Sequence, residues 1–307
     1  MLRHVAARLL SAIPTLLLIA TIAFALLHAA PGGPFDSEKR MLPAIQARIE
    51  ARYHLNEPVW RQYLRYLGDL AHGDLGPSFQ YRETSVNDIV RQGLPVDAVV
   101  GLSALALALL LGGGIGIHAA LRQGSGWDYA PMALAIVGVS IPTFVTAPLL
   151  ILIFAIWLHW LPAGDWVAGS IAHLAMPAVA LALPYIGTVA RLMRASTLEV
   201  LTSPFIRSAH AKGLPAHLIL WRHALRPALT PLVSYLGPAA AGLLTGSIVV
   251  ESVFGLPGIG RFFIIGALNR DYTLVMGITV IYGALIILFN LLADLCYAWL
   301  DPRVRLR

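Results

Sequence analysis

The chain has 307 residues, of which 58% are hydrophobic and only 12% charged, and its mean hydropathy is +0.73. This composition excludes an ordinary water-soluble globular protein and indicates a membrane protein. The formal net charge of +6 does not indicate a nucleic-acid partner, because most basic residues border apolar runs, where lipid headgroups account for them. The single cysteine, Cys296, excludes an intrachain disulfide or a thiolate metal cluster.

The first apolar run, from Leu9 to Ala30, follows Arg3 and Arg8 and predicts a transmembrane helix. About 22 residues at about 1.5 Å each give a helix of roughly 33 Å, enough to cross the hydrocarbon core. A cleaved signal peptide is the alternative. The run is longer than a usual signal-peptide core and lacks a clear small-x-small cleavage pattern, which favours a retained span.

Residues 31–95 are polar and carry charges of both signs. Trp60, Leu64, Leu67 and Ala71 recur at helical spacing, which predicts short amphipathic helices. With the N-terminus inside, this region must face outside, and a loop of this length largely escapes the positive-inside rule. It is either a docking surface for an external solute-binding protein or a structural cap over the spans.

Five further apolar runs complete six predicted spans: Val96–Leu121, Tyr129–Trp160, Ile171–Leu192, Ala228–Val253 and Thr273–Leu300. Six spans place both termini on the same side of the membrane. That side is predicted to be cytoplasmic, because most of the basic residues of the short loops then lie there.

Acidic residues are missing from the predicted span centres, since Asp97, Glu251 and Asp294 all lie toward span ends. A mid-span carboxylate is costly and is typical of ion coupling, so this pattern argues against a proton- or sodium-coupled carrier. Neither a G-x-S-x-G elbow nor an H-E-x-x-H helix is present, which leaves an intramembrane hydrolase as a weakly supported alternative. The chain also lacks a phosphate-binding loop for ATP, and we expect no metal and no cofactor.

The longest polar connection in the second half of the chain is Arg191–Pro227, where six basic residues accompany one acid, Glu199. Basic loops stay in the cytoplasm. Ser203 and Pro204 can begin a short helix that Gly213 ends. A short helix on a basic loop favours docking to a soluble protein, and a solvated loop without a partner is the alternative.

The segment RSAHAKGL (Arg207–Leu214) resembles the coupling loop of ABC-importer permeases of the dipeptide, oligopeptide and nickel group. Arg207 and Ser208 stand where the general signature has Glu and Ala, and the loop ends in Leu-Arg-Pro where that signature has Leu-Pro. The resemblance runs nearly end to end, through APGGPF (30–35), YHLNEP (53–58), HGDLGPSF (72–79), GLPGIG (255–260), NRDYTLVMG (269–277) and DPRVR (301–305).

This resemblance implies an all-α membrane protein with six transmembrane helices and the type I ABC-importer permease fold. Residues 1–93 would form the N-terminal helix and an extracytoplasmic insertion, residues 94–300 the permease core with the coupling loop at 191–227, and residues 301–307 a cytoplasmic tail. The implied function is oligopeptide import across a bacterial inner membrane, with a dipeptide, nickel or other small-solute importer as the alternative. The implied partners are a second homologous permease, two ABC ATPase subunits that hydrolyse the ATP, and an extracytoplasmic peptide-binding protein.

The resemblance also assigns site residues. The ATPase-coupling residues would be Arg207, Ser208, Ala209, Ala211, Lys212, Gly213 and Leu214. We expect the small Ala209 and Gly213 to let the helix lie close to an ATPase, and nearby basic side chains to pair with its acids. Gly255, Pro257, Gly258 and Gly260 form a second family segment, for which we expect an extracytoplasmic gate or re-entrant turn, with a plain turn as the alternative. No catalytic residue is expected in this chain.

Overall fold

The computed structural model describes residues 2–30, 54–81 and 83–300, and this part of the chain is helical with one isolated β-bridge, Pro77–Ser85. The expected cytoplasmic tail, residues 301–307, lies outside the described residues. The chain forms two compact units. We call Ala6–Pro95 with Gly258–Ala284 the insertion unit, and Val96–Pro257 with Met1–Val5 and Leu285–Arg307 the core unit.

Within the described residues, four helices are long and apolar enough to cross a membrane: Val5–Ala29, Val86–Leu121, Ile171–Leu201 and Tyr272–Cys296. Three bent helix pairs raise the number of candidate spans to seven. Six of these seven correspond to the six runs predicted from the sequence. The seventh pair, α13 (Ile248–Phe254) with α14 (Ile259–Leu268), contains the glycine-rich segment for which a gate or turn was expected.

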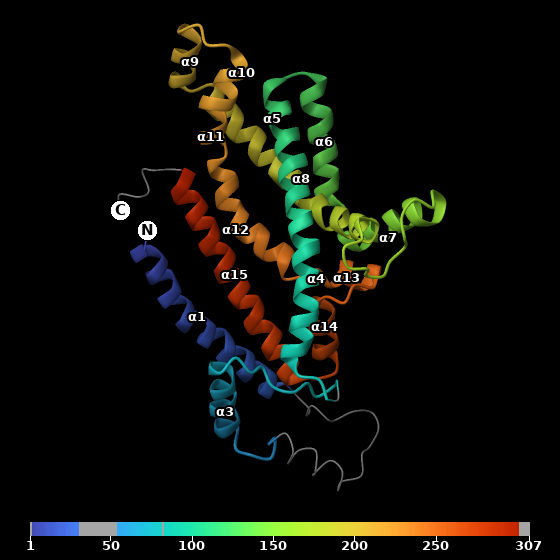
Figure 1. Cartoon of the computed structure of the whole chain (residues 1–307). Coiled ribbons are helices and arrows are strands. Elements are labelled where there is room, and N and C mark those ends of the chain that lie inside the picture. The colour runs from blue at the N-terminus through green and yellow to red at the C-terminus, as the bar shows by residue number, and fades with distance from the viewer. Residues whose placement is uncertain (1, 31–53, 82, 301–307) are drawn as a thin grey trace. The chain divides into compact units, whose positions relative to one another are not determined.

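Helix α3 (Val59–Ala71) packs beside α1 (Leu2–Ala29) in the insertion unit (Figure 1). The ring of Phe24 lies 5.2 Å from that of Tyr63, and the Tyr63 hydroxyl lies 2.7 Å from the hydroxyl of Thr21. The amphipathic helix was predicted correctly, but its packing face was not: Trp60 and Leu64 are exposed. The tyrosine face is the better match to α1, because a tyrosine buries its ring and still finds a hydroxyl partner.

A buried carboxylate organises the end of the insertion unit. Asp271 precedes α15 (Tyr272–Leu300) and is fully buried. One of its oxygens accepts hydrogen bonds from the Ser78 hydroxyl (2.5 Å) and the Gln80 amide (3.0 Å). The other accepts a hydrogen bond from the Leu274 amide at 3.1 Å, and the Thr273 hydroxyl beside it donates to the Pro77 carbonyl oxygen at 2.5 Å. Asp271 therefore caps α15 and ties the loop before α4 to it.

Helix α4 (Val86–Leu107) begins ten residues before the predicted span, and it continues through η1 (Ala108–Gly112) into α5 (Gly113–Leu121). Ser85 and Asp88 start it by a reciprocal cap. The Asp88 amide donates to the Ser85 hydroxyl oxygen (3.1 Å), and the Ser85 hydroxyl donates to the Asp88 carboxylate (2.6 Å). Pro95, expected near the boundary, lies inside the helix. Asp97, which was expected toward a span end, lies roughly three turns inside α4.

Helices α5, α6 (Gly126–Ser140) and α8 (Ile171–Leu201) lie side by side in the core unit (Figure 1). Their contact depends on glycine. A Cβ at Gly116 would lie 2.5 Å from the carbonyl oxygen of Ala190, and one at Gly187 would overlap the carbonyl oxygen of Ala135. Small residues of this kind let helix backbones approach closely, which is how helices associate in lipid.

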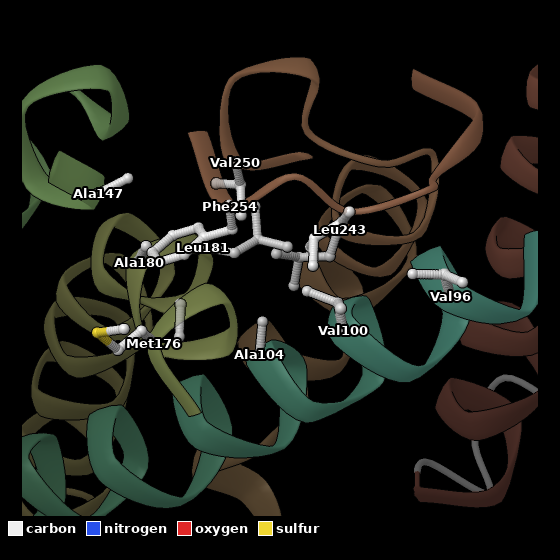
Figure 2. Close-up of a cluster of buried hydrophobic side chains, with 12 residues drawn as sticks. Val96, Val100, Ala104, Ala147, Met176, Ala180, Leu181, Leu243, Val250 and Phe254 are labelled. Carbon is white, nitrogen blue, oxygen red and sulfur yellow. The ribbon is translucent and has the colours of Figure 1, made fainter. Parts of the chain in front are cut away.

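A hydrophobic cluster fills the other part of the core unit. Figure 2 shows Val96, Val100 and Ala104 on α4 facing side chains of α8, α12 (Thr230–Leu244) and α13. Leu243 and Phe254 are almost completely buried in it. Burial of such side chains stabilises each by roughly 1.5–3 kcal/mol, so this cluster fixes the relative positions of these four helices.

Two predicted spans are not straight. The run Tyr129–Trp160 bends by 105° between α6 and the helix that starts with α7 (Thr143–Leu150) and continues as η2 (Ile151–Trp157). Pro142 explains the break, because the residue before a proline avoids helical geometry, and Ile141 is extended. The run Ala228–Val253 breaks after α12, where Gly246 has φ +77°.

Candidate functional site

The basic segment after α8 folds into the short helix that its sequence predicted. Helix α9 covers Pro204–Ala211, with extended Ser203 before it and proline at its first position. Lys212 follows as the last cap residue, and Gly213 adopts φ +74°, a conformation that ends a helix. Proline needs no backbone donor at the first position and glycine tolerates the left-handed region, so both ends of α9 are set locally.

Helix α9 has one packed face and one exposed face. Ile206 and Ala209 are buried against Ile219 and Ala224 of η3 (Ile219–Ala224). The exposed residues among those assigned to ATPase coupling are Arg207, Ser208, Ala211, Lys212 and Gly213, while Leu214 is half-buried. The reason expected for Ala209 was therefore wrong. Its small side chain allows packing inside this chain, and it does not form part of the exposed face.

Two exposed aromatic residues were not singled out from the sequence. Phe205 on α9 is 50% exposed and Trp221 on η3 is 68% exposed. Both lie on the basic segment, where exposed aromatic side chains beside positive charge are typical of protein interfaces. Their apolar character alone could not distinguish them from core residues, because the helix face that is buried depends on where η3 packs.

The base of this segment is anchored to the core unit by a two-pronged ion pair. Arg194 near the end of α8 donates to both oxygens of Asp128 on α6, with distances of 2.6 and 2.7 Å. The Asp128 side chain is 1% exposed and that of Arg194 is 29% exposed. Two charge-assisted hydrogen bonds in one plane fix the geometry of the pair. The Ser196 hydroxyl adds a 2.7 Å bond to the carbonyl oxygen of Ala228 at the end of α11 (Leu225–Ala228).

A cavity of about 450 Å³ lies in the core unit, where α8 and α12 contribute most of its lining. Five of its lining side chains carry hydroxyl groups: Thr143, Tyr185, Thr188, Tyr235 and Ser247. Pro184 on α8 and two glycines, Gly242 and Gly246, also line it. The lining residues, all within the described part of the chain, carry no formal charge. A neutral wall of hydroxyl groups can bind amides through hydrogen bonds without selecting the charge of a side chain.

Two acidic side chains converge behind this wall. Asp97 and Glu251 are 3% and 2% exposed, and both side chains lie close to Gly246. A Cβ at Gly246 would lie 3.2 Å from an Asp97 carboxylate oxygen and would overlap Glu251. The sequence could not show this convergence, because it depends on the break between α12 and α13.

The glycine-rich segment that was expected to form a gate contains the end of α13 and the start of α14. Gly255 ends α13 in the left-handed region with φ +69°, and the Leu256 amide then donates to the Glu251 carbonyl oxygen at 2.8 Å. Gly258 is the N-cap of α14 with φ −84°, and Gly260 is buried in that helix. In this segment, only Gly255 has a backbone conformation that other residues rarely adopt. The gating role of the segment stays a prediction.

Comparison with known proteins places this architecture in a class. The model of the binding-protein-dependent transport system inner membrane component matches residues 112–306, and the model of the N-terminal part of such membrane components matches residues 1–99. The chain belongs to this family of inner membrane components of transport systems.

Individual relatives match over the whole length of the chain. The oligopeptide transport system permease protein OppB of Escherichia coli strain K12 is 53% identical over 305 residues, which is 99% of this chain and 100% of that protein. OppB of Haemophilus influenzae is 51% identical with the same coverage. The dipeptide transport system permease protein DppB of Bacillus subtilis is 42% identical over 306 residues, which is 100% of this chain and 99% of that protein.

A solved structure supports the fold. The crystal structure of an amino acid ABC transporter matches 69% of this chain and 94% of its own chain, with a TM-score of 0.54 at 20% identity. At this identity the likeness concerns the fold alone. The family match and the full-length permease relatives show that the chain is a membrane permease subunit and not an enzyme. Among the described residues, no group of three His, Cys, Asp or Glu side chains is placed to hold a metal ion.

Proposed function

We propose that this chain is the permease subunit of an oligopeptide importer that is driven by ATP hydrolysis on separate subunits. Full-length similarity to proteins named oligopeptide permease, at 51–53% identity, is the observation that carries the proposal. Dipeptide import is the second candidate, because a protein named dipeptide permease also matches over the full length, at 42% identity.

The assembly consists of this permease, a second homologous permease, two ABC ATPase subunits and an extracytoplasmic peptide-binding protein. Both termini and the basic segment face the cytoplasm, and residues 31–95 face outward. In this proposal the membrane is the bacterial inner membrane, residues 1–93 carry the first span and the extracytoplasmic insertion, and residues 94–300 carry the permease core with the coupling loop.

The exposed face of α9 forms the contact with an ATPase. Arg207 and Lys212 supply positive charge for acids of the partner, and the exposed ring of Phe205 supplies an apolar anchor. Movement of α9 is transmitted to the other helices of the core unit through its packing on η3 and through the Arg194–Asp128 pair near the end of α8. Since α8 also lines the hydroxyl-rich cavity, closure of the ATPases changes the shape of that cavity and gives alternating access.

The experiment that tests this proposal is peptide uptake by a Gly213→Asp variant. Gly213 is exposed, has φ +74° and has no atom within 4 Å of a Cβ, so an aspartate there adds strain and negative charge at the end of α9 without a steric clash. We expect normal abundance in the membrane and uptake reduced by about 5- to 150-fold, the range of a coupling free energy of ~1–3 kcal/mol.

Gly169→Asp is the matched control. Gly169 is also exposed, has φ +78° and has open space around it, but it lies in the loop between η2 and α8. The same strain and charge at that site should leave uptake unchanged. Normal uptake by Gly213→Asp at normal abundance would contradict the coupling role of α9.

A further inference from the structure

A second cavity, of about 220 Å³, lies in the insertion unit. It is bounded by the end of α1, by α3, by the loop 74–79 and by the start of α15. Among the described residues, four phenylalanine and tyrosine rings contribute to its wall: Phe24, Tyr66, Phe79 and Tyr272. All four also belong to one packed cluster, in which Phe24 stacks on Tyr66 with 6.0 Å between ring centroids and Tyr272 is buried beside them. The walls are therefore aromatic and held in place.

Among the described residues, the unbalanced charge around this cavity is negative. Arg65 also lines it, but its guanidinium donates to both oxygens of Glu57 at 2.9 and 3.0 Å and is thereby neutralised. Asp69 and Asp74 line it as well. Within the described chain, the Asp69 carboxylate makes no hydrogen bond or ion pair, and Asp74 uses one oxygen to accept the Gly76 amide at 2.9 Å.

The histidines of the cavity are already engaged. The ring of His28 lies between the Phe24 carbonyl oxygen (2.9 Å) and the side-chain oxygen of Gln62 (3.3 Å). His54 contacts Glu57 at 3.1 Å. These contacts leave the two aspartates as the groups available to a ligand.

The volume limits the occupant. Pockets that enclose a whole drug-sized ligand measure roughly 300–1,000 Å³, which is more than this cavity provides. One side chain with an apolar stem and a polar end suits it better. Arginine and lysine have this form, their cations are attracted to aromatic faces, and two carboxylates at the same site complement their charge.

We propose that this cavity is the socket for one arginine or lysine side chain of the extracytoplasmic peptide-binding protein when that protein docks on the insertion unit. This inference rests on the proposed function, which supplies the docking partner and the outward orientation of residues 31–95. The socket orients the bound protein over the permease, because a single buried basic side chain fixes position more sharply than exposed charge does.

The test compares two variants of the complete complex in sealed lipid vesicles. Asp69→Asn removes the unpaired carboxylate of the cavity. Glu83→Gln is the matched control, because Glu83 is an exposed acid of the same unit that does not line the cavity. We expect Asp69→Asn to weaken the affinity for the peptide-loaded binding protein about fivefold and Glu83→Gln to leave it unchanged.

Uptake in the same preparations, measured at saturating binding protein, distinguishes a docking defect from a folding defect. A variant that only docks more weakly then imports peptide at the wild-type rate, whereas a misfolded variant does not. Substitution of the matching basic residue of the binding protein should abolish the difference between wild type and Asp69→Asn. Equal affinities for wild type and Asp69→Asn would overturn the socket, as would a defect confined to the uptake of basic peptides. Failure of the wild-type complex to import any peptide would instead contradict the proposed function.

Discussion

Replacing Asp271 with asparagine should release the loop before α4 from the start of α15. One carboxylate oxygen accepts hydrogen bonds from the Ser78 hydroxyl and the Gln80 amide, and the other accepts one from the Leu274 amide. An amide keeps one accepting oxygen and turns the other position into a donor, so the bonds to one of the two oxygens lose their acceptor. A hydrogen bond to a charged group contributes roughly 1.5–3 kcal/mol, which gives a loss of about 3 kcal/mol for two bonds at the lower end or one at the upper end.

Hydrogen exchange measures this loss at a defined site. The Gln80 and Leu274 amides donate to different oxygens of Asp271, at 3.0 and 3.1 Å. The amide that loses its acceptor should exchange about 100-fold faster if local opening controls exchange, because the loss is about 3 kcal/mol. Glu83→Gln is the control, since it removes an exposed carboxylate from the same loop. Unchanged exchange at both amides in Asp271→Asn would refute the role of Asp271 as the anchor of this loop.

Three further predictions concern the core unit. Arg194→Lys keeps the charge but loses the two-pronged contact, so its unfolding temperature in detergent should lie below wild type and above that of Arg194→Ala; equal values for all three would contradict the anchoring role. Gly187→Ala should destabilise the α6–α8 contact by about 1–3 kcal/mol in thermal unfolding, whereas Gly138→Ala, whose Cβ would lie 3.6 Å from the nearest atom, should be near neutral. Gly255→Ala should cost about 1–2 kcal/mol in the same assay because of its φ of +69°, and Gly258→Ala should cost less; the reverse order would disprove the turn geometry.

The spans were predictable because an apolar run long enough to cross the hydrocarbon core has few other stable arrangements. Their bends were not. Pro142 marks a site where a helix must break, but the angle of 105° depends on how α6 and α7 pack on α8, which is a tertiary effect. The early start of α4 was missed because Pro95 resembles a boundary, while the cap formed by Ser85 and Asp88 is the stronger signal.

The candidate site was also predictable only in part. Pro204 and Gly213 set the ends of α9 through their own backbone preferences, so the helix could be predicted from the sequence. Which of its faces is buried could not, because that depends on η3, a segment whose position is determined by the bend into α12. For the same reason the cavity lining, which joins Tyr185 of α8 to Tyr235 of α12, has no signature in the sequence.

The measurement that tests the central claim most directly is uptake of labelled peptides of two to five residues. It uses vesicles that hold this permease with its co-purified partners, with and without ATP, and with free nickel ion as competitor. ATP-dependent uptake of the longer peptides that nickel does not inhibit is the predicted result. Uptake restricted to dipeptides or nickel would contradict the oligopeptide assignment, and uptake that persists without ATP in an ion gradient would contradict an ATP-driven importer.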